Sequence, residues 1–309
     1  MSKTLLNCLT IVLLVGCTAV EPVAVEPATD DPRDSAVRPT EMIRLFDGES
    51  LDGFYTWMKD TQREDPRNVF GVTDGMLHVT GDGLGGLLTE KEYRDYHLIM
   101  EAKWGPRTWD KRKERTKDSG LLIHSIGADG GYNGVWMPSI EVQMIEGGFG
   151  DFILVAGNDK DGEPVPMTLT TETARDRDDE VIWQEGGQRE TFNLENRRRI
   201  NWYGRDPDWE DVIGFRGKQD VESPDGQWTR MDVIADGGHI EVFINGVKVN
   251  EGFDVFPDYG RLQLQTELAE AFVRRWELWP LGEGPKPARL RTSSAAETDI
   301  RVPAASPNP

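Results

Sequence analysis

The chain has 309 residues, of which 37% are hydrophobic and 9% aromatic, and it carries a formal net charge of −20. This length and composition suffice for one large all-β domain or two smaller domains. Because phosphate binding requires a basic surface, so acidic a chain argues against nucleic acid or an anionic lipid surface as a partner.

The first residues have the pattern of a bacterial lipoprotein signal. Lys3 gives a short basic start, and the apolar stretch after it is too short to span a bilayer. The stretch ends in LVGC at residues 14–17, which resembles the lipobox in which the cysteine becomes lipidated and N-terminal. We therefore expect a signal peptide at residues 1–16, lipidation at Cys17, and a lipid-anchored location in the cell envelope, on the outer membrane or facing the periplasm. A plain signal peptide with a chance cysteine is the alternative.

The rest of the chain divides by composition. Residues 17–41 are rich in proline without an apolar period, which is typical of an extended tether. Residues 42–281 are expected to form the folded domain, with long charged loops at about 159–225. Residues 282–309, rich in Pro, Ala, Ser and Arg, are predicted to be a disordered tail.

Within the predicted domain, apolar residues alternate with polar ones. The segments with this period of two are 95–104, 230–236, 239–250, 260–267 and 271–281. Two-residue turns are indicated at Gly237-Gly238 and Asn245-Gly246. Short alternating strands without a βαβ rhythm predict an all-β fold, an antiparallel two-sheet jelly-roll sandwich.

Seven segments of the domain occur in an order that carries a family resemblance. They are IRLFDGESLDGFYTW, DGMLHVTGDGLGGLLTEKEYRDYHLIMEAKW, DSGLLIHSIG, GVWMPSIEVQMIEGGFGDF, PDGQWTRMDVI, VFINGVKVN and GRLQLQTELAEAFVRRWELWPL. Together they resemble the 3-keto-disaccharide hydrolase family over about residues 43–281. The resemblance implies a concanavalin A-like jelly roll that cleaves 3-keto-glycosides, either by hydrolysis or by elimination and hydration. The chain departs from the family at Asp118, where Asn is commoner, and at His124, where many members have Arg.

Two predicted strands place polar side chains together. The period of two puts Glu141 and Gln143 on one face of their strand, and it does the same for Gln263, Gln265 and Glu267 on theirs. Amides both donate and accept hydrogen bonds, and aromatic rings stack on pyranose faces, so such a surface suits a sugar. Trp136 and Trp104 are the candidates for stacking. These residues can equally be packing or solvated positions.

The chemistry of a 3-keto-glycoside suggests roles for these residues. The ketone acidifies the proton on C2, so a base can remove it, while the leaving group on C1 needs a proton. Glu141 is the candidate base, and His124 is the candidate acid or base because its imidazole titrates near neutral pH. Arg274 is a candidate for stabilising negative charge. The candidates for substrate binding are Gln143, Trp136, Asp118, Gln265, Glu267 and Arg274.

We expect no metal or other cofactor at this site. A divalent metal held by Asp118, His124 and Glu141 is the open alternative, although their spacing is not compact. No dinucleotide fingerprint stands out, since GDGLGG at 81–86 has no βαβ unit around it. A separate glycoside 3-oxidoreductase is therefore expected to supply the oxidised carbohydrate substrate.

Two other functions remain open at this point. Glu141, Gln143 and Glu146 form E-x-Q-x-x-E, which resembles the E-x-D-x-x-E signature of retaining jelly-roll glucanases. Such enzymes need two carboxyls about 5–5.5 Å apart, whereas alternation puts Glu146 on the opposite face from Glu141 unless a β-bulge intervenes. The second alternative is a lectin-like surface lipoprotein that binds glycans without catalysis.

Overall fold

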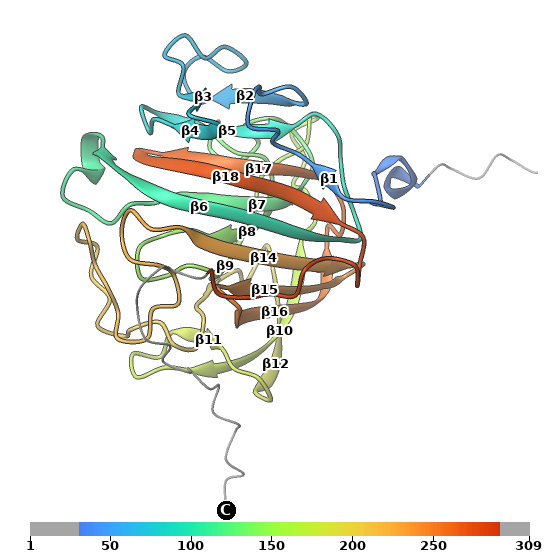
Figure 1. Cartoon of the computed structure of the whole chain (residues 1–309). Helices are drawn as coiled ribbons and strands as arrows, with labels where there is room; N and C mark the ends of the chain where they lie inside the picture. The colour runs from blue at the N-terminus through green and yellow to red at the C-terminus, as the bar shows by residue number, and fades with distance from the viewer. Residues whose placement is uncertain (1–30, 291–309) are drawn as a thin grey trace, which may run out of the picture. The chain divides into compact units, whose positions relative to one another are not determined.

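Alternating strands pair into two antiparallel sheets in the computed structural model, which describes residues 31–290 (Figure 1). The larger sheet has eleven strands in the order β11-β10-β16-β15-β14-β6-β18-β4-β3, with β1 beside β18 and β12 beside β10. The smaller sheet has the order β13-β9-β8-β7-β17-β5-β2. The all-β, two-sheet jelly-roll sandwich predicted from the sequence is confirmed.

The bounds of the elements follow the chain. The larger sheet contains β1 (Ile43–Arg44), β3 (Phe70–Thr73), β4 (Met76–Val79), β6 (Tyr96–Thr108), β10 (Thr168–Arg175), β11 (Val181–Trp183), β12 (Gln188–Asn193), β14 (Thr229–Asp236), β15 (His239–Ile244), β16 (Val247–Phe256) and β18 (Ala269–Trp279). The smaller sheet contains β2 (Phe54–Met58), β5 (Leu84–Thr89), β7 (Gly120–Ser125), β8 (Ser139–Gln143), β9 (Phe152–Val155), β13 (Arg199–Ile200) and β17 (Arg261–Glu267). Two short 3₁₀ helices are η1 (Pro32–Ser35) and η2 (Asp110–Arg112).

The core lies between the sheets and is built by the predicted alternation. On β6 the side chains that enter it are Tyr96, Leu98, Met100, Ala102 and Trp104, the face expected from the sequence. The smaller sheet contributes alternate residues of β7 and β8, namely Leu121, Ile123, Ile140 and Val142. Burying one such large side chain contributes about 1.5–3 kcal/mol. The alternate, outward-facing residues of both sheets are therefore not needed for this core.

Both predicted two-residue turns are present. Asn245 and Gly246 join β15 to β16 with φ of 48° and 81°, the left-handed conformation that a type I′ hairpin requires. Asn245 also accepts a hydrogen bond from the Arg230 N–H through its side-chain oxygen, at 3.0 Å. Gly237 and Gly238 join β14 to β15 as a second two-residue turn, in which Gly237 has a φ of 55°.

The segment 159–225 differs from the prediction of long charged loops, because part of it forms strands. It contains the strands β10, β11, β12 and β13, of which the first three extend the larger sheet and the last extends the smaller one. Its threonine-rich stretch at 168–173 packs apolar Leu169 inward while Thr171 donates to the Glu251 carbonyl oxygen. Hydroxyls that bond the backbone allow a polar sequence to form a strand, which the hydrophobic pattern does not reveal.

Ordered contacts also extend beyond the predicted limits of the domain. Val37 forms a parallel bridge with Tyr93, and Arg230 donates to the carbonyl oxygens of Pro285 and Lys286. The predicted signal peptide, Cys17 and residues 291–309 lie outside the described residues, so the outer limits of the domain stay a prediction. Among residues 31–290, no helix has the length and apolar character needed to cross a membrane.

Candidate functional site

The candidate site lies on the outer face of the smaller sheet, where three neighbouring strands align their side chains. Glu141 of β8 pairs directly with Ile153 of β9, and Ile153 pairs directly with Arg199 of β13. Directly paired residues point to the same face of a sheet. Glu141, predicted as catalytic, therefore shares this face with a cation from the edge strand.

Two glycines lie beside Glu141 on the neighbouring strands of the sheet. Gly120 of β7 pairs with Gln143 of β8, and Gln265 of β17 pairs with Gly86 of β5. A Cβ atom added at Gly120 would collide with both the Glu141 carboxylate and the Gln265 amide oxygen. The absence of a side chain at Gly120 thus allows these two polar groups to lean over the strand and approach each other.

The third part of the site is an ion-pair cluster at the ends of β7 and β17. Arg112, from η2, contacts the Asp118 carboxylate, and its Nη2 also donates to Glu267 Oε1 at 3.1 Å. The same guanidinium donates to the Thr116 carbonyl oxygen at 3.3 Å. One buried arginine therefore holds both Asp118 and Glu267 beside Glu141, and its Nη1 also lies 3.5 Å from Asp211 Oδ1.

These groups line one pocket of about 360 Å³. Its lining brings together the predicted site residues Asp118, Trp136, Glu141, Gln143, Gln265 and Glu267, and adds Tyr132, Ile153, Leu154, Val155, Arg197, Arg198 and Arg199. The rings of Tyr132 and Trp136 are stacked with centroids 6.1 Å apart at 15°. Trp136 is held by its indole N–H, which donates to the Gly85 carbonyl oxygen at 2.9 Å.

Burial and neighbouring carboxylate charges raise the pKa values of two carboxyl groups of this pocket, Glu141 and Asp118. Burial, followed by the charges of Asp118 and Glu267, raises the pKa of Glu141 well above its usual value. Burial and the neighbouring Glu267 raise the pKa of Asp118 to about 8, although Arg112 favours its ionised form. Strongly perturbed carboxyls in a cleft are typical of acid–base sites.

Two acceptors of the pocket lack a protein partner. Asp118 Oδ1 and Gln265 Oε1 are buried and make no hydrogen bond within the described part of the chain. Gln143 uses its oxygen to accept the Met144 N–H at 2.7 Å, which leaves its NH₂ group to donate. Unsatisfied buried acceptors are rare in folded proteins, and they suit the hydroxyl groups of a bound sugar.

His124 does not belong to this site, and its predicted role was wrong. Its side chain is fully buried between the sheets, with its ring centroid 5.9 Å from that of Tyr96 of β6 in an edge-on arrangement. Its Nδ1 donates to the Pro257 carbonyl oxygen at 3.0 Å. Burial lowers its pKa to about 4, so the imidazole is neutral. The alternation fails here because β7 contains a bulge before Ser125, and His124 adopts φ of 53°.

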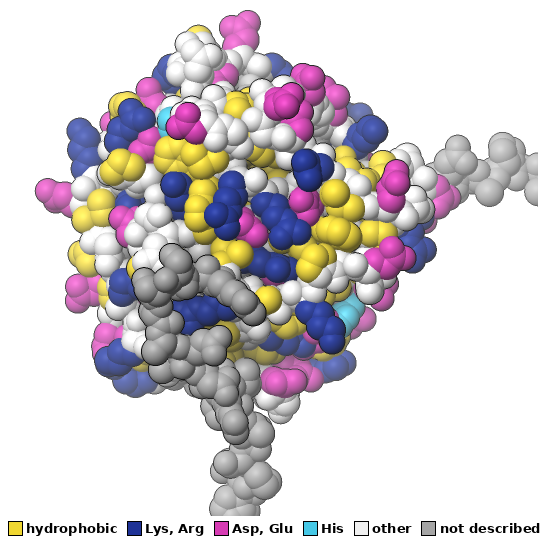
Figure 2. Space-filling view, in the orientation of Figure 1, with side chains coloured by type: hydrophobic (Ala, Val, Ile, Leu, Met, Phe, Trp, Pro, Cys, Tyr) yellow, Lys and Arg dark blue, Asp and Glu magenta, His cyan; other side chains and the backbone are white. Residues whose placement is uncertain are grey.

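Arg274 is a second correction. It lies on β18 of the larger sheet, paired with Glu101 at 2.6 Å and stacked 4.5 Å from the Trp228 ring. Figure 2 shows the outer face of this sheet, where Lys and Arg side chains lie among hydrophobic ones. The strand pattern was predicted correctly, but a local pattern does not reveal which of two sheets a strand joins.

Three further residues that the sequence suggested for function do not line the pocket. Trp104 is a core residue, with its ring edge against Phe149. Gln263 is buried, and its amide oxygen accepts the Met137 N–H at 3.3 Å. The Glu146 carboxylate accepts the backbone N–H groups of Lys117 and Gly214, at 2.9 and 3.0 Å, and does not line the pocket. The E-x-Q-x-x-E pattern therefore does not form the carboxyl pair of a retaining glucanase.

The metal alternative loses its nitrogen ligand with His124. In the described range, the group of His and acidic residues whose ligand atoms lie within 4.8 Å of one another is His239, Glu241 and Glu251, on β15 and β16. The Lys248 ammonium is 2.7 Å from an oxygen of each of these two glutamates. A lysine thus already supplies the positive charge at that cluster.

Sequence reasoning missed the cations and one aromatic of the pocket. Arg197, Arg198 and Arg199 come from the run ENRRRI, which was recognised only as charged. Arg112, which pairs with two carboxylates of the pocket without lining it, comes from a short 3₁₀ helix. Tyr132 lies four residues before Trp136 in a glycine-rich loop, and this aromatic spacing was the available signal.

Comparisons with known proteins place the chain in a family. Residues 41–278 match the model of a family described as the 3-keto-alpha-glucoside-1,2-lyase-like domain. No curated protein matches the chain significantly.

Similar solved structures include a protein from Parabacteroides distasonis, provisionally named a glycosyl hydrolase, with 16% identity, TM-score 0.43 and coverage of 78% of this chain and 94% of that one. The carbohydrate binding module CBM66 from Bacillus subtilis has 10% identity, TM-score 0.40 and coverage of 73% and 94%. A galectin-like protein of unknown function from Bacillus subtilis has 11% identity, TM-score 0.41 and coverage of 79% and 97%. The family match rests on sequence and covers most of the chain, which therefore belongs to the family of 3-keto-alpha-glucoside-1,2-lyase-like domains.

Proposed function

We propose that this carbohydrate-active protein cleaves the glycosidic bond of 3-keto-glycosides, with Asp118 and Glu141 as the acid–base pair. The observation that carries the proposal is a sugar-sized pocket holding two carboxyls, Asp118 and Glu141, whose pKa values are raised by burial and by the neighbouring Glu267 charge. Family membership supports the substrate class.

The different surroundings of the two carboxyls assign their roles. Asp118 contacts Arg112, whose charge favours the carboxylate, so Asp118 loses its proton first and acts as the base on C2. Glu141 forms no ion pair within residues 31–290, so it keeps its proton and gives it to the leaving oxygen on C1. The NH₂ group of Gln143 and the guanidinium of Arg199 are the donors available to the enolate oxygen.

The elimination balances within these residues. Asp118 takes the C2 proton, the electron pair of that C–H bond forms the C1–C2 double bond, and the C1–O bond breaks as Glu141 protonates the departing oxygen. Addition of water reverses these transfers: the Glu141 carboxylate accepts a water proton as oxygen attacks C1, and Asp118 returns its proton to C2. Release before hydration gives a lyase, and hydration in place gives net hydrolysis.

Stacked aromatics support the binding half of the proposal. Trp136 and Tyr132 line the pocket and can cover the apolar face of a pyranose. The oxidised substrate comes from a separate glycoside 3-oxidoreductase, and the protein acts in the cell envelope through a lipid on Cys17. We propose that no metal takes part, so turnover should survive exhaustive chelation.

The direct test is incubation of the purified protein with α- and β-3-keto-glucosides, followed by product analysis with NMR and mass spectrometry. We expect release of the aglycone together with either 2-hydroxy-3-keto-glucal or 3-keto-glucose, and no reaction with the unoxidised glucosides. Binding of the keto sugar without any turnover would instead establish the lectin alternative. Release of reducing sugar from an unoxidised β-glucan would favour a conventional glucanase.

A further inference from the structure

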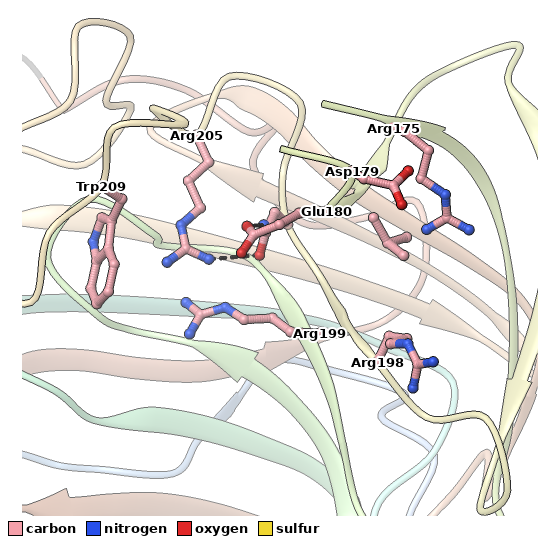
Figure 3. A pocket seen from close by; sticks show the side chains of 9 residues that line it. Arg175, Asp179, Glu180, Arg198, Arg199, Arg205 and Trp209 are labelled. Atoms are coloured by element: carbon pink, nitrogen blue, oxygen red, sulfur yellow. Dashed lines mark hydrogen bonds between the residues drawn. The ribbon is translucent and has the colours of Figure 1, made fainter. Parts of the chain in front are cut away.

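Two further pockets open at opposite ends of the smaller sheet. The one beside β13, of about 660 Å³, has arginines that are bonded within the protein (Figure 3). Asp151 Oδ2 lies 2.7 Å from Arg199 Nη2 and 3.3 Å from Arg205 Nη1, and Arg205 also donates to the Asn201 side-chain oxygen at 2.6 Å. Figure 3 shows Arg198 pointing away from both of these guanidinium groups. Two of the arginines of this pocket therefore already have partners.

The pocket at the other end of the sheet is larger, about 810 Å³, and lies beside β2. We call it the β2 pocket; its polar lining includes Tyr55, Arg63, Glu92, Asp129, Tyr259 and Arg261. Direct pairing across five strands joins it to the candidate site through Tyr55, Leu88, Gln263, Leu122 and Glu141. Because directly paired residues point to the same face of a sheet, Tyr55 shares the outer face with Glu141. Four inter-strand spacings, about 19 Å, separate the backbones of these two residues.

The loop 127–137 stands between the two pockets on this face. Tyr132 lines the candidate site, whereas Asp129 of the same loop lines the β2 pocket. The Trp57 indole N–H, from β2, donates to the Gly134 carbonyl oxygen at 3.2 Å and holds the loop against the sheet. One loop thus forms a wall of both pockets and keeps them separate.

A second loop, which follows β9, closes the other side of the β2 pocket. The Ala128 N–H donates to the Asn158 carbonyl oxygen at 3.2 Å, and the Asn158 N–H donates to the Gly131 carbonyl oxygen at the same distance. A Cβ atom at Gly131 would collide with the Asn158 carbonyl oxygen, so glycine is needed for this close approach. Backbone contacts between the loops therefore form the pocket in advance of any ligand, as is usual for small-molecule sites.

The charges in the lining of the β2 pocket are balanced. It contains three cations and three carboxylates, namely Arg63, Lys160, Arg261, Glu92, Asp129 and Asp159. Arg63 Nη2 donates to Asp129 Oδ2 at 2.7 Å, and Arg261 Nη1 donates to Glu92 Oε1 at 3.0 Å. No net charge is left in the lining, which favours a neutral ligand.

The paired groups keep hydrogen-bonding capacity for such a ligand. Arg261 Nη2 and Glu92 Oε2 make no hydrogen bond within the described part of the chain. The Tyr55 hydroxyl donates to Asp129 Oδ1 at 2.7 Å, so its oxygen remains an acceptor, and the Arg63 guanidinium 3.8 Å from the ring centre fixes the phenol. Donors and acceptors held side by side match sugar hydroxyls, each of which both donates and accepts.

We propose that the β2 pocket is a second carbohydrate site, which binds a neutral hexose unit of a glycan without cleaving it. Tyr55, Glu92 and Arg261 supply the hydrogen bonds. The apolar side chains of Ile126 and Met137 line the same pocket and pack against the C–H groups of the sugar ring. The site requires no 3-keto group, so it goes beyond the proposed function and does not depend on it.

Binding of unoxidised disaccharides tests the second site without catalysis. Isothermal titration of the purified full chain would use cellobiose, laminaribiose, maltose and trehalose, with sodium glucuronate as the anionic comparison. We expect at least one of the four neutral sugars to bind with a Kd of about 1 mM or tighter, and glucuronate to bind no more tightly than that sugar. Absence of binding by all four neutral sugars would overturn the inference, and so would a preference for glucuronate.

Two variants and a matched control locate the binding. Tyr55→Phe and Arg261→Gln should each weaken it by about 2- to 10-fold, the usual contribution of one hydrogen bond. Both should keep kcat/KM for a simple 3-keto-glucoside within about twofold, and thermal unfolding checks that they are folded. Tyr132→Ala removes an aromatic side chain from the candidate site and should leave the disaccharide affinity unchanged.

The outcomes separate this inference from the proposed function. Wild-type affinity in both Tyr55→Phe and Arg261→Gln, or loss of binding in Tyr132→Ala alone, would assign the sugar to the candidate site and overturn the second site. A protein that binds the disaccharide through Tyr55 and Arg261 but never cleaves a 3-keto-glycoside would instead remove the proposed function and leave the second site standing.

Discussion

The outer faces of the two sheets look alike in sequence, with polar side chains at alternate positions, but their charges are arranged differently. On the larger sheet, Glu101 is paired with Arg274 and Arg275, and Asp232 accepts from both His97 and Arg230. Each of these carboxylates has two cationic or donor partners. Their negative charges are therefore compensated by neighbouring side chains, as is usual on the surface of a sheet.

On the smaller sheet, three carboxyls converge with far less compensation. Asp118 and Glu267 share Arg112, and Glu141 has no ion pair among the described residues. All three side chains lie in the 360 Å³ pocket, beside a glycine that makes room for them. Leaving buried acids underpaired costs stability, so the contrast between the faces indicates that the smaller sheet keeps them for chemistry. The predictions below test this contrast.

The largest expected effect comes from Glu141→Gln, which keeps the shape of the side chain but removes the acidic proton of the carboxyl group. Turnover of a 3-keto-glycoside should fall by about 10²–10⁴-fold, the usual contribution of a general acid or base. The matched control is Glu101→Gln on the larger sheet, which should change turnover less than about twofold. Similar losses in both variants, measured as kcat/KM, would mean that the two faces do not differ in function.

A smaller effect is expected from Asp118, and it depends on pH. The base must be ionised, so kcat/KM should rise with pH up to a pKa of about 8 and then level off until Glu141 loses its proton. Asp118→Asn should lower kcat/KM by about 10²-fold and abolish the rise. A pH profile of the wild type and the variant measures both. An unchanged acidic limb in the variant would assign the titration to another group.

Gly120→Ala tests the floor of the pocket rather than its acids. The new methyl group would displace the ends of the Glu141 and Gln265 side chains, which can move, so we expect stability to change by less than about 1 kcal/mol. Turnover should fall about 10-fold, because small misplacements of reacting groups are costly. The control is Gly71→Ala, where an added Cβ meets nothing within 4 Å. Urea unfolding and steady-state kinetics separate the two effects, and unimpaired turnover would show that the floor is not needed.

Local patterns predicted the parts of the molecule that depend on neighbours in sequence. Alternation placed Glu141 with Gln143 and Gln265 with Glu267, and the Asn245-Gly246 turn fixed one hairpin. Alternation also predicted the two-sheet sandwich, and Trp136, proposed as a stacking aromatic, lines the pocket.

The errors arose where position depends on distant partners. A bulge in β7, which inserts one extra residue into the strand, turns His124 into the core, and an alternating sequence pattern cannot reveal such a bulge. Arg274 was wrongly expected at the site because the sequence of β18 does not reveal that it pairs with β6 in the larger sheet. Arg199 was missed because β13 has only two residues and is held by Asp151, 48 positions earlier.

His124→Asn should have the smallest effect on turnover, and its consequence appears in stability instead. The folded pKa of His124, about 4, lies below the ordinary value of 6.5, so the unfolded chain binds the proton more readily. Folding stability should therefore be complete above about pH 6.5 and fall as the pH drops toward 4, by about 3 kcal/mol for this group. Asparagine tolerates the positive φ at this position and does not titrate, so the variant should lose this part of the acid sensitivity while keeping kcat/KM within about threefold. Urea unfolding at pH 4.5, 5.5 and 7 measures the slope, and a large loss of turnover in a folded variant would return His124 to the mechanism.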